Sequence, residues 1–241
     1  MANARVAPGR PRALCCFNVP ITSRPVRSII SLLAALLLAA PAVAAPEKWA
    51  ADIDKFTVAD AVQAPVANGV VFVGSSSIRL WTTLAEDFPG VPTINRGFGG
   101  SEMADSLFYA DRIVLPYKPR IVVVYAGEND LAAGKSPEVV LADFQAFRAK
   151  VHAALPATKI IYLACKESPS RAKVRAQVRQ ANKLIAADCA TAPRCTFLDV
   201  ATPMLTDTGD FRPELFREDR LHMLPAGYAI WTRLLAPLLQ P

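Results

Sequence analysis

Four short runs of this 241-residue chain combine the side chains that acyl transfer requires. They are Gly74-Ser75-Ser76-Ser77, Gly97-Phe98-Gly99-Gly100, Gly127-Glu128-Asn129-Asp130 and Asp219-Arg220-Leu221-His222. Together they offer a hydroxyl nucleophile, a histidine base, a carboxylate that can orient the base, and donors for an oxyanion. The sequence therefore indicates cleavage or transfer of an acyl group as the candidate chemistry.

His222 is the candidate base, because the only other histidine, His152, falls inside a predicted helix with apolar neighbours. Asp219 lies three residues before His222, so its carboxylate could hold the imidazole in the tautomer that a base requires. Taken alone, this pair would fit a hydrogen-bonded contact at the surface equally well. With only two histidines, a multi-histidine metal site is nearly excluded.

Strand and helix patterns alternate from about residue 68 onward and would position the four runs. Strands are predicted at residues 70–74, 93–95, 120–125, 159–164 and 196–200. Helices are predicted at residues 101–115, 136–155, 171–190 and 224–239, the second with Ser136 as its N-cap and Pro137 after it. The alternation predicts a three-layer α/β domain around a parallel sheet of about five strands. Ligands of such sheets bind beyond the carboxyl ends of the strands, where the polar runs fall.

The net charge of +6 belongs mostly to the first part of the chain. Residues 1–46 hold five arginines and no acid, which leaves about +1 for the remainder. We therefore expect no nucleic-acid partner. The first strand is not followed by a glycine-rich phosphate loop, which also disfavours a flavin or nucleotide binder.

Residues 1–45 have the pattern of a secretory signal peptide. Arginines precede a short apolar run at residues 29–40, and Pro41 and the small residues 42–45 follow it. Cleavage after Ala44 or Ala45 would leave residues 46–241 as a single domain without a membrane span. The run is too short to serve as a transmembrane anchor. We expect an exported protein, either periplasmic or secreted.

Three cysteines remain after residue 45, namely Cys165, Cys189 and Cys195. An oxidising compartment would allow Cys189 and Cys195 to pair across a short segment that contains proline. Two separate buried thiols are an equally good interpretation.

The four runs resemble the conserved blocks of the SGNH hydrolases, also called the GDSL esterase/lipase family, in the family's order. Gly74-Ser75-Ser76 lies over the G-D-S block, and residues 95–100 lie over the block that ends in glycine. Residues 127–130 match G-x-N-D in full, and Asp219 with His222 matches D-x-x-H. The resemblance covers roughly residues 68–238. It departs at Ser75, where the family has aspartate, which affects the nucleophile turn and not the triad acid.

The resemblance implies a flavodoxin-like SGNH hydrolase fold and a role for each site residue. Ser76 would be the nucleophile, with Ser77 as the next candidate and Ser75 the last. Asp219 and His222 would complete the triad. The oxyanion hole would consist of the backbone N–H groups of Ser76 and Gly100 and the side-chain amide of Asn129.

The implied activity is that of an exported serine esterase, which hydrolyses carboxylic esters with short to medium acyl chains through an acyl-enzyme on Ser76. Neither a cofactor nor a metal is implied, and the partner is a small-molecule ester, either a lipid or an acetylated sugar. A carbohydrate O-acetyl esterase, a lysophospholipase and a thioesterase are alternatives within the family. A catalytically silent binding module is the alternative outside it. The oligomeric state is left open by the sequence.

Several residues near these runs have plainer interpretations. The serines could cap a helix, and Asn129-Asp130 could form a turn. Trp81 is expected to pack in the core. Charged side chains expected to face solvent are Glu128, Lys166, Glu167, Arg171, Lys173, Arg175 and Arg179.

Overall fold

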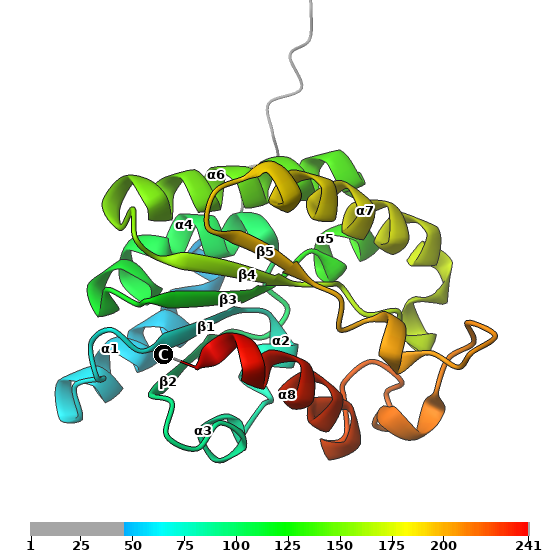
Figure 1. Cartoon of the computed structure of the whole chain (residues 1–241), viewed down its shortest axis with the longest axis horizontal. Helices are drawn as coiled ribbons and strands as arrows, with labels where there is room; N and C mark the ends of the chain where they lie inside the picture. Colours follow the sequence, from blue (N-terminus) through cyan, green and yellow to red (C-terminus); the bar gives the residue numbers. More distant parts are fainter. Residues whose placement is uncertain (1–45, 241) are drawn as a thin grey trace, which may run out of the picture. The chain divides into compact units, whose positions relative to one another are not determined.

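A single parallel sheet of five strands forms the centre of the fold, in the order β2-β1-β3-β4-β5 (Figure 1). The computed structural model describes residues 46–240. The strands are β1 (Val70–Gly74), β2 (Thr93–Gly97), β3 (Ile121–Tyr125), β4 (Lys159–Leu163) and β5 (Cys195–Leu198). The strand order and the flanking helices confirm the predicted three-layer, flavodoxin-like architecture.

Alternate strand residues feed two separate cores, because successive side chains of a strand point to opposite faces. Val71 and Val73 belong to the core shared with α1, α4, α6 and α7. Val70 and Phe72 belong to the core shared with α2, α3 and α8. All five residues of β1 are buried, as the continuous apolar run predicts for a strand covered on both faces.

Helices of both layers follow the strands, with short 3-10 turns between them (Figure 1). The helices are α1 (Ala50–Val62), α2 (Ser76–Arg79), α3 (Leu84–Asp87), α4 (Met103–Ile113), α5 (Glu128–Ala132), α6 (Pro137–Ala154), α7 (Arg175–Thr191) and α8 (Pro225–Leu239). The 3-10 turns are η1 (Pro46–Trp49), η2 (Leu115–Tyr117), η3 (Pro169–Val174), η4 (Thr202–Met204) and η5 (Pro213–Leu215). Ser136 caps α6 as predicted, since its side chain accepts a hydrogen bond from the Val139 amide.

Two features differ from the sequence-based expectation. The helix predicted at residues 171–190 begins later, because residues 169–174 form the 3-10 turn η3, in which Arg171 has non-helical backbone angles. The turn η1 and the helix α1, which the sequence patterns do not predict, precede β1 in the chain and place Trp49 and Ile53, respectively, in the core.

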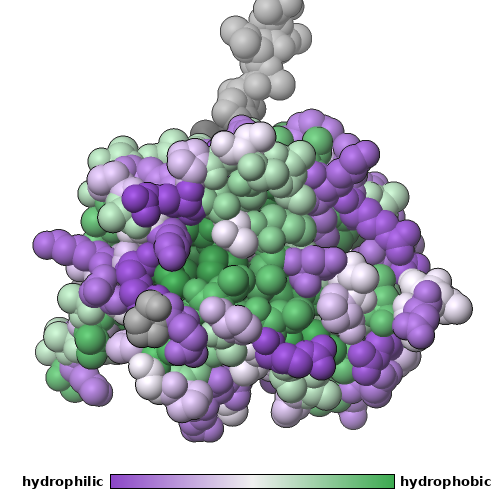
Figure 2. Space-filling model, in the orientation of Figure 1, coloured by the Kyte–Doolittle hydropathy of each residue, from purple (hydrophilic) through white to green (hydrophobic). Residues whose placement is uncertain are grey.

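β5 is an edge strand that pairs only with β4, and its residues are at most partly buried. Figure 2 shows apolar side chains gathered on this face between α7 and α8. Phe197, Leu198, Ile230 and Leu234 are among the partly buried side chains packed there.

No helix within residues 46–240 is long and apolar enough to cross a membrane. The predicted signal peptide at residues 1–45 lies outside the described residues. Its removal, and the domain boundary that removal would set, therefore stay predictions.

Candidate active site

The three predicted triad side chains lie within hydrogen-bond distance of one another. The Nε2 atom of His222 is 2.9 Å from the Ser76 hydroxyl oxygen, and its Nδ1 atom is 2.6 Å from Oδ2 of Asp219. An ionised carboxylate only accepts hydrogen bonds, so Nδ1 carries the hydrogen and Nε2 is left as the acceptor for the serine proton. This is the arrangement of a nucleophile, a base and an orienting acid.

Asp219 is held by its own loop as well as by the imidazole. Its Oδ1 atom accepts hydrogen bonds from the backbone amides of Leu221 and His222, each at 2.9 Å. Burial alone would raise the pKa of Asp219, but the hydrogen bonds from His222 and Leu221 lower it to about 2. The carboxylate therefore stays ionised at any pH near neutrality and can stabilise a protonated imidazole.

Ser76 begins α2 directly after β1, at the point where the strand order of the sheet reverses. The turn depends on Gly74, whose φ is +138° and whose missing Cβ would lie 1.9 Å from the Tyr125 carbonyl oxygen. Ser75 occupies the N-cap position of α2, but its side chain makes no capping hydrogen bond. Ser77 is buried, and its carbonyl oxygen accepts a hydrogen bond from the Tyr228 hydroxyl. Of the three serines, Ser76 is the one that contacts the base.

The predicted oxyanion-hole residues come from three different strand ends. Gly100 has a φ of +79° and follows β2, and its amide N–H makes no hydrogen bond within residues 46–240. The Asn129 side chain follows β3 and donates one hydrogen bond to the Ser101 carbonyl at 2.9 Å, which leaves its second N–H available. Ser76, at the start of α2, lines the same cavity as Gly100 and Asn129, so the prediction that these three residues form an oxyanion hole stays open.

Asp130 ties the Asn129 turn to the segment that carries Gly100. Its fully buried carboxylate accepts a hydrogen bond from the Met103 amide at 3.0 Å and pairs with Lys135 at 3.1 Å. Burial raises the pKa of Asp130 to about 6, although Lys135 and the Met103 amide act against this. The aspartate of the Gly-Glu-Asn-Asp run thus connects the turn that carries Asn129 to the segment that follows Gly100.

Trp49, from the turn that precedes α1, supports the Gly100 segment from outside. Its indole N–H donates to Asp105 at 3.0 Å, and its ring packs edge-on against Phe98 at 5.7 Å. A Cβ added to Gly100 would lie 3.4 Å from the Trp49 ring. Trp49 therefore helps to hold the Gly100 segment in place, which the sequence patterns did not predict.

A buried polar cluster lies behind the nucleophile turn, and it corrects the expectation that Glu128, Lys166 and Glu167 face solvent. Lys166 is 1% exposed, and its ammonium group contacts Glu128 at 2.6 Å. Glu128 also accepts hydrogen bonds from the hydroxyls of Tyr125 and Ser168. Trp81, in contrast, packs in the core as expected.

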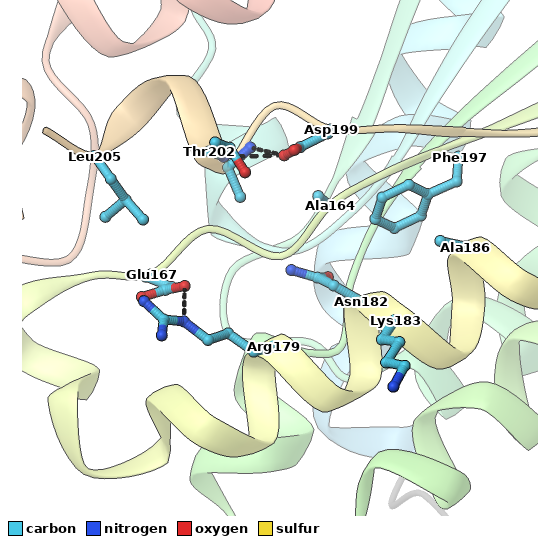
Figure 3. A pocket seen from close by; sticks show the side chains of 11 residues that line it. Ala164, Glu167, Arg179, Asn182, Lys183, Ala186, Phe197, Asp199, Thr202 and Leu205 are labelled. Atoms are coloured by element: carbon cyan, nitrogen blue, oxygen red, sulfur yellow. Dashed lines mark hydrogen bonds and ion pairs between the residues drawn. The ribbon is translucent and has the colours of Figure 1, made fainter. Parts of the chain in front are cut away.

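Glu167 is 7% exposed and pairs with Arg175 and Arg179, so these two arginines are not simply a solvated helix face. The Glu167–Arg179 pair lines a cavity of about 510 Å³ between α7 and the loop that follows β5 (Figure 3). Asp199, on the other side of this cavity, accepts hydrogen bonds from the amides of Ala201 and Thr202. None of the predicted site residues lines this cavity.

Ser76 and His222 line a different cavity, of about 400 Å³. Its lining consists of Asp52, Ser76, Arg79, Gly99, Gly100, Asn129, Arg171, Leu221 and His222. Arg171, expected to be a solvated residue of a helix, belongs to this lining, and its Nη2 atom donates to Oδ1 of Asn129 at 3.2 Å. Sequence spacing places Arg79 close to Ser76, whereas Asp52 and Arg171 come from segments that only the fold brings here.

Comparisons with known proteins identify the family of this chain. The model of the GDSL-like Lipase/Acylhydrolase family matches residues 66–230. The chain is 28% identical over 179 residues to the human platelet-activating factor acetylhydrolase IB subunit alpha1, covering 70% of this chain and 74% of that protein.

Two solved structures share the fold. A GDSL-like lipase from Bacteroides thetaiotaomicron has a TM-score of 0.66 at 22% identity, covering 78% of this chain and 97% of that chain. A mutant acetyl-xylooligosaccharide esterase from Geobacillus stearothermophilus has a TM-score of 0.58 at 16% identity, covering 73% and 96%. Since the matched segment runs through all four polar runs and both layers of helices, the chain belongs to the GDSL-like Lipase/Acylhydrolase family.

Proposed function

We propose that this protein is a serine esterase with Ser76 as nucleophile, His222 as general base and acid, and Asp219 as the orienting carboxylate. The observation that carries the proposal is the continuous contact from Asp219 through His222 to Ser76, at 2.6 Å and 2.9 Å. Membership of an acylhydrolase family supports the same reaction class.

The reaction proceeds in two halves. The Ser76 oxygen attacks the ester carbonyl while Nε2 of His222 takes its proton, and the carbonyl oxygen becomes an oxyanion that Gly100, Asn129 and the Ser76 amide stabilise. Collapse of this intermediate breaks the ester bond, and His222 protonates the leaving alkoxide. A water molecule, deprotonated by His222, then attacks the acyl-enzyme and releases the acid.

We infer that the acyl group is short, with acetate the first candidate. The cavity at Ser76 is lined mainly by polar and charged residues, and only Leu221 adds an apolar side chain of any length. Such a lining does not favour burial of a long acyl chain. The human relative is named an acetylhydrolase, and the Geobacillus neighbour an acetyl-xylooligosaccharide esterase. Among acetyl esters, an acetylated sugar is therefore a candidate substrate beside an acetylated lipid.

Hydrolysis of p-nitrophenyl esters from acetate to palmitate tests the proposal, with Ser76→Ala and the control Ser170→Ala compared with the unaltered protein. Ser170 is exposed and lies outside the cavity lining. We expect activity on acetate that falls with chain length, and a loss of up to about 10⁶ in kcat in Ser76→Ala only. Activity retained by Ser76→Ala would refute the assignment of the nucleophile.

We also propose export, on the basis of the pattern in residues 1–45. N-terminal sequencing of protein recovered from a bacterial periplasm or culture medium should begin at residue 45 or 46. Recovery of only the uncleaved chain from the cytoplasm would contradict the proposal.

A further inference from the structure

Two guanidinium groups, those of Arg79 and Arg171, line the cavity that holds Ser76 and His222. Arg79 ends the short helix that Ser76 begins. A Cβ added to Gly99 would lie 2.7 Å from Nε of Arg79 and 3.0 Å from its Nη2 atom, so this guanidinium lies across Gly99, next to Gly100. Arg171 lies next to the other proposed donor, Asn129, and its Nη2 atom donates to Oδ1 of that side chain at 3.2 Å.

The charge of Arg79 has no partner in the part of the chain that the structure describes. Its side chain makes no hydrogen bond and no ion pair there, and the residue is exposed to the cavity. Within residues 46–240, the guanidinium of Arg171 makes one hydrogen bond, to Asn129, which leaves most of its five N–H donors available. The neighbouring Arg175 and Arg179, in contrast, are both paired with Glu167.

Among the described residues that line the cavity, Asp52 is the only acidic one, and it forms no ion pair with Arg79 or Arg171. Its carboxylate pairs with Lys55 of the same helix at 2.7 Å. With Asp52 held by Lys55, the two arginines leave the mouth of the catalytic cavity positively charged. A cavity walled by one sign of charge concentrates ligands of the opposite sign.

We propose that Arg79 and Arg171 form a subsite for an anionic group, a phosphate or a carboxylate, carried by the ester substrate. This inference rests on the proposed esterase function and names the class of its substrate. An arginine fork matches the geometry of both anions and binds them by charge-assisted hydrogen bonds. Because the two guanidinium groups flank Gly100 and Asn129, the anion would lie within a few bonds of the carbonyl that these donors hold.

Arg171 also orients the Asn129 amide, so a change at this position affects every substrate. Within the described residues, the side chain of Arg79 makes no hydrogen bond to Ser76, His222 or Asn129, so Arg79 tests the subsite more cleanly. The ratio of the rates on an anionic and a neutral ester separates the role in orienting Asn129 from the role in binding the anion. Loss of an oxyanion donor lowers both rates, whereas loss of the subsite lowers only the rate on the anionic ester.

Three acetyl esters provide the test on the full chain: neutral monoacetylglycerol, acetylglycerol phosphate and acetylglycerate. We expect kcat/KM for the phosphate, the carboxylate or both to exceed that for the neutral ester at least about tenfold. The ester that is hydrolysed faster shows whether the subsite binds a phosphate or a carboxylate. The preference should shrink several-fold when salt is raised from about 20 mM to about 500 mM, since a partly exposed subsite is screened.

Arg79→Gln should lower kcat/KM for the anionic ester far more than for the neutral ester, which removes most of this preference, and Arg79→Lys should keep part of it. Arg171→Gln should lower the same ratio. Lys173→Gln, which removes an exposed charge from the same turn as Arg171 but outside the cavity, should leave the ratio unchanged. Circular dichroism spectra of all variants should be the same as that of the parent.

Two results would overturn the inference: no preference for either anionic ester, or equal losses on anionic and neutral esters in Arg79→Gln. Either would leave the esterase proposal standing. Failure to hydrolyse any ester, p-nitrophenyl acetate included, would instead refute the proposed function.

Discussion

The imidazole Nε2 of His222 lies 2.9 Å from the hydroxyl of Ser76, although 146 positions separate the two residues in the chain. Ser76 is placed by the end of β1, and His222 by the irregular segment between β5 and α8. Local sequence does not bring these two residues together. Their contact depends on the whole fold, and it identifies the site.

Asp219→Asn should reduce kcat about 10³–10⁴-fold while leaving the fold intact, because an amide can favour the wrong imidazole tautomer. The exposed Asp207, which lies outside the site, provides the matched control Asp207→Asn. Steady-state kinetics on p-nitrophenyl acetate measure the effect. A loss of less than tenfold in Asp219→Asn would show that the carboxylate does not act on His222.

Much of the fold could be predicted from the sequence because its strands are buried on both faces. β1 and β3 are continuous apolar runs in the sequence. Such a run indicates a buried strand without knowledge of the strands that pair with it. The triad and the oxyanion residues could be predicted because their spacing within each run is local, as in the three residues from Asp219 to His222.

Burial of charged side chains could not be predicted in the same way, because it depends on partners that are distant in the chain. Glu128 and Lys166 look like surface residues until the fold brings them together across 38 positions. Arg171 was expected on a helix surface because its sequence continues into α7, yet it lies in the preceding 3-10 turn and lines the cavity.

The contributions of Lys166 and Glu128 to the free energy of unfolding should depend on each other. Lys166→Met alone would leave a buried carboxylate without its cation and should cost about 3–5 kcal/mol in the free energy of unfolding. Adding Glu128→Gln should restore part of this loss. Urea denaturation of Lys166→Met, Glu128→Gln and the double variant measures these effects.

The matched control for these changes in a buried ion pair is Lys55→Met. The Lys55 side chain is 74% exposed in its pair with Asp52. It should cost less than about 1 kcal/mol. Strict additivity of the two changes at Lys166 and Glu128 would show that the buried charges do not depend on each other.

Asp130 should make the protein less stable as pH rises from about 4 to about 6. Burial raises the pKa of this carboxyl from its ordinary 3.8 to about 6, so the folded chain keeps a proton that the unfolded chain has already released. Raising the pH through this window therefore favours unfolding, by up to about 3 kcal/mol from this one group.

Asp130→Asn should remove that part of the pH dependence, measured as the free energy of unfolding in urea at several pH values. Asp207→Asn is again the control, since its carboxylate is exposed. The same slope in Asp130→Asn as in the parent protein would contradict the assignment.

Cys189 and Cys195 should form a disulfide when an oxidant is supplied. Their sulfur atoms lie 2.7 Å apart, where the end of α7 meets the start of β5. The hydrogen bond with Cys189 lowers the pKa of Cys195, and Arg148 adds to this effect. Cys195 can then attack oxidised glutathione and release one glutathione thiol, and Cys189 can resolve the mixed disulfide and release the second.

Peptide mapping measures this reaction, because trypsin cleaves at Arg194 and the disulfide would join the two fragments. The joined pair should weigh about 2 Da less than the separate peptides, while Cys165 stays reduced because burial raises its pKa to about 12. In Cys189→Ser, the mixed disulfide on Cys195 should persist. Joined fragments that contain Cys165 would contradict the pairing.

Labelling with a fluorophosphonate followed by fragment mass spectrometry tests the central claim most directly, because the probe reacts only with an activated serine. The peptide from Phe56 to Arg79 contains all three adjacent serines, so fragmentation locates the adduct among them. The mechanism predicts an adduct on Ser76 that is absent in Ser76→Ala and strongly reduced in His222→Ala. An adduct on Ser75 or Ser77 of the unaltered protein, or undiminished labelling of Ser76→Ala, would contradict it.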